Sequence, residues 1–119
     1  MSFRKLQADV LRWAKDKDLV HEENAEAQFM KFIEEAFEFR YEMERYKRDV
    51  GEMKRLSLDK AKVEMGDIFV TLIILCEQIG IDPEECLSMA YEKISKRKGK
   101  TIGGMFYKQE DLEGMEWEK

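Results

Sequence analysis

The chain of 119 residues suits one domain, and its net charge of −5 argues against a general nucleic-acid binder. No stretch approaches the roughly 20 apolar residues that span a bilayer, since the longest run, 68–76, is bounded by Asp67 and Glu77. The first residues lack the apolar core of a signal peptide, and Cys76 and Cys86 lie in apolar helical segments where they need not pair. We therefore expect a cytoplasmic protein with reduced thiols, and neither a membrane nor a nucleic acid among its partners.

Two helices are predicted in the first half of the chain. The first runs over about residues 3–15, with Ser2 as its N-cap and an apolar stripe that includes Trp13. A polar, acidic connector follows at 16–23. Asn24 is the expected N-cap of a long second helix that ends near Gly51.

A third helix is predicted to begin after Ser57, with Asp59 in its first turn, and to stop before Gly80. Its centre, 68–76, is rich in β-branched residues, but the length of the pattern favours a helix over a buried strand. Because this helix is apolar on nearly every side, we expect it to be buried against several neighbours, a second subunit included.

The fourth helix has the clearest start, because Asp82-Pro83-Glu84-Glu85 supplies an N-cap, a proline at the first position and a capping-box glutamate. We expect it to run to about Lys98 and to end at Gly99. A small hairpin around Gly103-Gly104 is predicted in the segment 101–107, and no element is predicted for the acidic last dozen residues. The expected fold is an all-α, compact four-helix bundle in one domain, 1–119, with a short C-terminal tail or hairpin.

Two carboxylate clusters stand inside these apolar helices. The first is Glu34, Glu35 and Glu38, and the second, Glu64 and Asp67, follows after 25 intervening residues. A helix turns about 100° per residue, so carboxylates three apart share a face. If the two helices pack antiparallel, four carboxylates converge on one point and need a compensating cation.

The first pattern is not specific by itself, because the chain contains it a second time at Glu22, Glu23 and Glu26. That copy lies near a helix N-terminus, where the helix dipole favours acidic residues without any binding site. The alternative without a binding site is two solvent-exposed acidic helix faces, on which Lys31 and Lys60 form ion pairs with glutamates of their own helices. Asp67 disfavours that alternative, because aspartate is a poor helix former and this one directly precedes the most apolar run of the chain.

Oxygen ligands alone favour a hard cation, Mg²⁺ or Mn²⁺. A ferritin-like di-iron site is disfavoured, because the lone His21 lies in the connector and no Glu-x-x-His pair exists. Mg²⁺ shares its coordination sphere readily with substrate phosphates, so the occupied cluster would be a phosphate site.

At these residues the sequence resembles the MazG-type all-α nucleoside triphosphate pyrophosphohydrolases, whose superfamily includes dimeric dUTPases and dCTP pyrophosphatases. The signature is Glu-Glu-x-x-Glu, a gap, then Glu-x-x-Asp, and the chain matches it at Glu34, Glu35, Glu38, Glu64 and Asp67. The likeness covers about residues 5–107, including the segment 81–85 that opens the fourth helix.

The resemblance implies that Glu35, Glu38, Glu64 and Asp67 bind Mg²⁺, that Glu34 orients or deprotonates the attacking water, and that a (d)NTP is cleaved between its α- and β-phosphates. Lys93 and Arg97 match the family's phosphate-binding Lys and Arg, whereas Tyr91 and Glu92 stand where many members carry an Asn. Weaker candidates for the nucleotide pocket are Trp13, Gln28 and Lys31.

Two other readings of the chain stay open at this point. One is a non-enzymatic helical interaction module whose acidic faces are merely solvated, and the other is a dUTPase-like enzyme that also acts on diphosphates. A house-cleaning role in the nucleotide pool is implied by the family alone. The family likeness, together with the apolar third helix, predicts a homodimer or a homotetramer.

Overall fold

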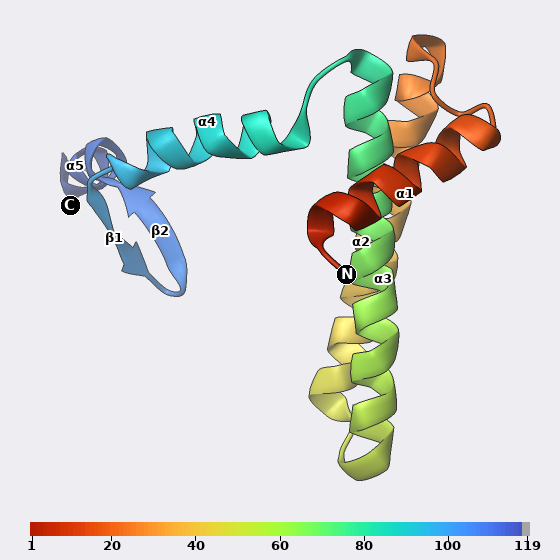
Figure 1. Ribbon diagram of the computed structural model, residues 1–119. Coiled ribbons are helices and arrows are strands. Elements are labelled where there is room, and N and C mark those ends of the chain that lie inside the picture. The colour runs from red at the N-terminus through yellow and green to blue at the C-terminus, as the bar shows by residue number, and fades with distance from the viewer. Residues whose placement is uncertain (118–119) are drawn as a thin grey trace. The chain divides into compact units, whose positions relative to one another are not determined.

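The computed structural model describes residues 1–117, with side chains described for residues 1–114. The chain divides into two compact units, the first spanning Met1–Pro83 and the second beginning at Glu84. The first unit contains three α-helices and a short 3₁₀ helix (Figure 1): α1 (Phe3–Asp16), η1 (Glu22–Asn24), α2 (Ala25–Arg48) and α3 (Gly51–Ile79).

Local capping explains the first helix. The Ser2 hydroxyl accepts a hydrogen bond from the Lys5 amide at 3.1 Å, which confirms it as the N-cap of α1. Asn24 precedes α2 as predicted, but its side chain does not cap that helix. Its amide instead donates to the carbonyl of Leu19 at 3.3 Å and holds the α1–η1 connection.

The helices α2 and α3 form a tight antiparallel hairpin with a two-residue link (Figure 1). The predicted start of the third helix after Ser57 is wrong, because α3 begins at Gly51, whose φ is +59°. Ser57 is only 2% exposed, and its hydroxyl donates to the carboxylate of Asp49, so this bond joins the link to α3. The Lys54 ammonium lies 4.5 Å from the centre of the Tyr46 ring and also joins the helices.

The third helix is also the platform for α1. Phe3 packs edge-to-face on Phe69 with ring centres 5.7 Å apart, and the Lys15 ammonium lies 3.9 Å from the Glu77 carboxylate. The buried apolar side chains of this unit are small in number: Ala14, Ala61, Ile73 and Ile74.

The second unit consists of α4 (Pro83–Ser95), the strands β1 (Gly99–Ile102) and β2 (Met105–Lys108), and α5 (Gln109–Trp117). The strands pair antiparallel, with Lys100 opposite Tyr107. Gly103 and Gly104 make the turn with φ of +57° and +80°, which confirms the predicted hairpin.

Two expectations for the second unit are corrected. The helix α4 ends at Ser95 and not near Lys98, because the amide of Arg97 turns back to the carbonyl of Ile94 and the chain then enters β1. The acidic end is helical over 109–117, and Leu112, 6% exposed, anchors it.

The protein is mostly helical, which confirms the all-α class, with a small two-stranded sheet added. The helices α1, α2 and α3 lie in the first unit, whereas α4 opens the second unit. The packing of all four helices into one bundle therefore stays a prediction. Among the described helices, none combines the length and apolar character that a membrane crossing requires.

Candidate metal centre

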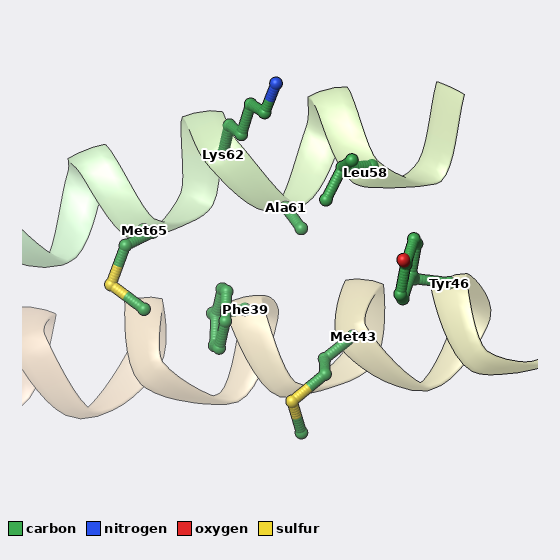
Figure 2. Close-up of a pocket in the computed structure, with 7 residues that line it drawn as sticks. All are labelled: Phe39, Met43, Tyr46, Leu58, Ala61, Lys62 and Met65. Carbon is green, nitrogen blue, oxygen red and sulfur yellow. The ribbon is translucent and has the colours of Figure 1, made fainter. Parts of the chain in front are cut away.

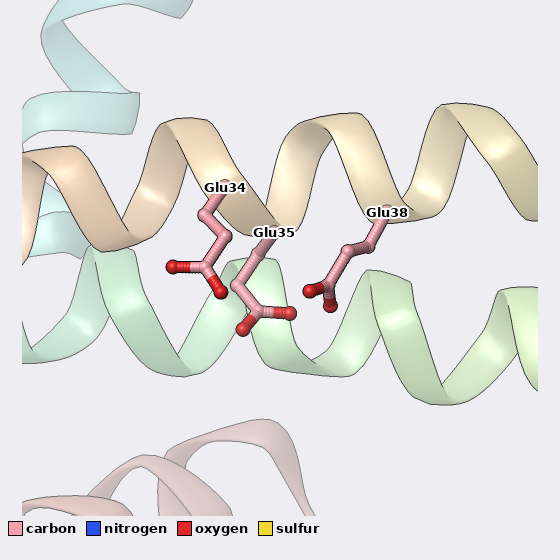
Figure 3. Close-up of side chains that lie close together, drawn as sticks. All are labelled: Glu34, Glu35 and Glu38. Carbon is pink, nitrogen blue, oxygen red and sulfur yellow. The ribbon is translucent and has the colours of Figure 1, made fainter.

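The carboxylates of α2 and α3 meet across the interface of the hairpin. One oxygen each of Glu35, Glu64 and Asp67 lies within 4.8 Å of the other two. A second group with the same spacing is formed by Glu34, Glu35 and Glu38, whose side chains leave α2 on the side of α3 (Figure 3). Glu35 belongs to both groups, so five carboxylates form one cluster, named here the carboxylate cluster.

Burial of these carboxylates destabilises the fold when no cation is bound. Glu35 is only 6% exposed, and its Oε2 atom is buried without a hydrogen-bond partner. The Oε2 atom of Glu64 is buried and unpartnered in the same way. An unpaired buried carboxylate oxygen destabilises a fold by about 1–3 kcal/mol or more, because it has lost water without gaining a donor.

Repulsion between the carboxylates changes the pKa of Glu64. Its pKa is raised from 4.5 to about 7, first by burial, then by a hydrogen bond with Glu38 and by the negative charges of Glu38, Asp67 and Glu35. Near neutral pH the cluster therefore retains a proton that an isolated glutamate would have lost.

Lys31 supplies the one cation seen at the cluster among residues 1–114. Its ammonium lies 3.4 Å from an oxygen of Glu34 and 3.4 Å from an oxygen of Glu35. The pKa of Lys31 is raised, first by the hydrogen bond to Glu35 and then by the charge of Glu34. Internal Lys–Glu pairing thus occurs on α2.

The α3 half of the cluster has no such partner. In the described part of the chain, Lys60 makes no ion pair with Glu64, and no cation pairs with Asp67. The alternative of two self-paired acidic faces therefore accounts for one helix and not for the other.

The donor set fits a hard divalent cation. Carboxylate oxygens are the ligands that Mg²⁺ and Mn²⁺ prefer, and neither a histidine nor a cysteine belongs to the two groups. Ligand oxygens on opposite sides of Mg²⁺ lie about 4.2 Å apart, so rotation of flexible side chains now within 4.8 Å suffices to close the site. The unpartnered oxygens of Glu35 and Glu64 would gain the partner that the protein does not provide.

Sequence reasoning did not place Glu42 in the site. Its side chain is 12% exposed with one buried, unpartnered oxygen, and it lines a hollow of about 460 Å³ with Glu34, Phe37, Glu38, Tyr41 and Glu64. The signal was its position four residues after Glu38 on the same face. Phe37 and Tyr41, 64% and 57% exposed, form the apolar wall of this hollow.

The other predicted binding residues have different surroundings. The Gln28 amide donates to the carbonyl of Thr71 at 3.4 Å, so it ties α2 to α3. Trp13 is 51% exposed and lines a separate hollow between α1 and α3 with Leu6 and Val70. Lys93 and Arg97 belong to the second unit, where Lys93 is in the last turn of α4 and Arg97 lies beside Lys98 in a polar hollow.

A further hollow of about 460 Å³ lies between the two helices of the hairpin, nearer its tip (Figure 2). Its lining is apolar apart from Lys62 and comprises Phe39, Met43, Tyr46, Leu58, Ala61 and Met65. None of these lining residues is a carboxylate, a histidine or a cysteine, so the groove is not a candidate metal site.

Comparison of the chain with protein-family models, with curated proteins and with solved structures finds no match. The chemistry of the carboxylate cluster therefore has to be inferred from its own side chains and from the motif that they form.

Proposed function

We propose that this protein is a MazG-type nucleoside triphosphate pyrophosphohydrolase that depends on Mg²⁺, with Mn²⁺ as a substitute. The observation that carries the proposal is the convergence of Glu35, Glu64 and Asp67 with buried carboxylate oxygens that lack a partner. The motif spacing in the sequence supports the same assignment. The proposed setting is the cytoplasm, in nucleotide-pool house-cleaning.

Each cluster residue has a proposed task. Glu35, Glu38, Glu64 and Asp67 would hold the cation, which supplies charge neutralisation at the phosphates and a more acidic water. Glu34 is 57% exposed at its side chain and reaches the edge of the cluster, so it suits orientation of the attacking water and acceptance of its proton.

The reaction is an attack of water on the α-phosphorus. A bond forms from the water oxygen to phosphorus, the bond to the α–β bridging oxygen breaks, and monophosphate and pyrophosphate leave. Lys31 can exchange its carboxylate partners for a phosphate oxygen. Lys93 and Arg97 are proposed as further phosphate-binding cations.

A helical interaction module is the second candidate. The large number of exposed apolar side chains on the hairpin, such as Phe37 and Val63, each 64% exposed, favours it, because such surfaces mark binding faces. A dUTPase-like enzyme that also cleaves diphosphates differs from the first proposal only in its substrates and products.

A product assay separates these functions. Standard and modified (d)NTPs and the matching diphosphates are incubated with the protein and Mg²⁺, and monophosphate, pyrophosphate and orthophosphate are quantified. The proposal expects monophosphate with pyrophosphate, and losses of at least a hundredfold for Glu38→Gln and Asp67→Asn. Release of orthophosphate with diphosphate would refute cleavage between the α- and β-phosphates.

The matched control is Glu23→Gln, which alters the acidic repeat at η1 and should leave turnover unchanged. Thermal melting with Mg²⁺ and a non-hydrolysable triphosphate gives a second readout. An absence of both turnover and stabilisation in the wild type would favour the interaction module.

A further inference from the structure

The connector between α1 and η1 holds an aspartate at a position whose backbone favours glycine. Asp18 has a φ of +58° and is the one residue other than glycine with a positive φ in the described chain. Its amide donates to the carbonyl of Lys15, and the Leu19 amide donates to the carbonyl of Ala14, both at 3.0 Å. These two bonds form a Schellman motif, in which the left-handed position is usually a glycine. The turn alone does not explain an aspartate there.

The Asp18 carboxylate binds the ring of His21. Its Oδ1 atom lies 2.5 Å from Nε2 of the imidazole, a distance typical of a charge-assisted hydrogen bond. The pKa of His21 is raised from 6.5, first by this hydrogen bond, then by the negative charge of Asp18, and further by that of Glu23. The aspartate therefore supplies an ion pair that a glycine at this position would lack.

Two side-chain amides hold the same turn at the carbonyl of Leu19. Gln78 of α3 donates to this carbonyl at 2.8 Å, and Asn24 donates to it at 3.3 Å. Gln78 is only 6% exposed, so it joins the connector to α3 from within the first unit. Because the bond between Asp18 and His21 spans the residue that both amides bind, it stabilises the turn that links α1 to α3.

The helix α1 depends on such links. Phe3 packs on Phe69 near its first turn, and the Lys15 ammonium lies 3.9 Å from Glu77 near its last. Ala14 is the one residue of α1 that is buried. Burial alone therefore holds this helix weakly, and the connector contributes to how firmly its C-terminal end lies on α3.

We propose that Asp18 and His21 form a pH-dependent latch, which fastens the C-terminal end of α1 to α3 when His21 is protonated. The protonated ring is a cation that donates to the carboxylate, whereas the neutral ring offers no charge to it. Because the pKa of His21 is raised above 6.5, the stabilisation is fully present below pH 6.5 and is lost as pH rises through the raised value. The latch uses contacts of the first unit only and is independent of the proposed function.

The surrounding charges support this direction. Glu23 of η1 also favours the protonated ring of His21. From α3, the connector receives the neutral amide of Gln78, and the neighbouring Glu77 is paired with Lys15. An ion pair with little burial changes a local equilibrium by about two- to fivefold, so the latch is a graded device and not an all-or-none switch.

Nuclear magnetic resonance of the intact protein tests the latch at the connector itself. His21 is the single histidine of the chain, so its imidazole signals report one titration. Its midpoint should lie above 6.5 in the wild type. Hydrogen exchange of the Leu19 amide and of the Gln78 side-chain amide should be about threefold more protected at pH 5.5 than at pH 8. Local signals are needed because Glu64 titrates in the same range and changes the global stability.

Three substitutions separate the charge from the backbone. Asp18→Asn retains a side chain that tolerates the left-handed conformation but removes the charge, so it should lower the His21 midpoint and abolish the pH dependence of protection. Asp18→Gly should also abolish the pH dependence, yet should protect the Leu19 amide at pH 8 at least as well as the wild type, because the backbone strain is gone. Asp16→Asn, two residues earlier, is the matched control and should behave like the wild type.

Three results would overturn the latch. The first is a wild-type His21 midpoint at or below 6.5. The second is equal protection of the Leu19 amide at the two pH values despite a raised midpoint. The third is a pH-dependent protection that Asp18→Asn retains, which would assign the effect to another titrating group. If the Leu19 amide responds but the Gln78 side chain does not, the pair stabilises the turn without fastening α1 to α3, and the proposal fails as well.

Discussion

Glu64→Gln is the substitution that most directly tests the electrostatics of the carboxylate cluster. Burial and the neighbouring carboxylates raise the pKa of Glu64 to about 7 from 4.5. Glutamine has almost the same shape but no charge, so it removes the repulsion and can donate to Glu38. We expect the metal-free variant to be more stable than the wild type at pH 8 and equal to it near pH 4.5.

The magnitude follows from the pKa. Between pH 4.5 and 7 the folded wild type binds more protons at Glu64 than the unfolded chain does, so its stability falls as pH rises through this window. Each pKa unit is worth about 1.4 kcal/mol, so the rise from 4.5 to about 7 gives at most about 3.5 kcal/mol, and partial solvent access reduces this to roughly 2. For a chain of this length that corresponds to a melting temperature about 5–10 °C higher for the variant at pH 8.

Thermal melts by circular dichroism at several pH values, with EDTA or with Mg²⁺, measure both effects. Mg²⁺ should stabilise the wild type at pH 8 and should stabilise Glu64→Gln much less, because one ligand charge is gone. Glu44→Gln, an exposed position paired with Arg40, is the control and should follow the wild type. A Glu64→Gln protein that melts below the wild type at pH 8 in EDTA would refute the reasoning.

Three further substitutions address the surroundings of the cluster and the fold. Lys31→Met should lower the melting temperature in EDTA at pH 8 but not in excess Mg²⁺, because a bound cation replaces the lost ammonium; equal losses in both buffers would contradict this. Ile74→Ala should cost about 2–5 kcal/mol in urea unfolding, whereas Val63→Ala, at an exposed position, should stay within about 0.5 kcal/mol. Gly99→Ala should open the hairpin, since its Cβ would overlap the carbonyl of Tyr107, and amide exchange in β1 and β2 should rise; unchanged exchange would contradict the close approach.

The fold could be predicted from sequence wherever the signal was local. The Ser2 cap, the proline that opens α4 and the paired glycines of the hairpin each act on a few neighbouring residues, and each is found as expected. The start of α3 was misplaced because Ser57 resembles an N-cap. Its hydroxyl instead donates to the Asp49 carboxylate, and a hydrogen bond of this kind produces no periodic pattern in the sequence.

The candidate site was predictable to the same extent. Helical spacing and an antiparallel pair suffice to bring Glu35 to Glu64 and Asp67, and the structure places them within 4.8 Å. The burial of Glu42 was not predictable, because it depends on how closely α2 and α3 pack at that level. The relation of Lys93 and Arg97 to the cluster stays a prediction.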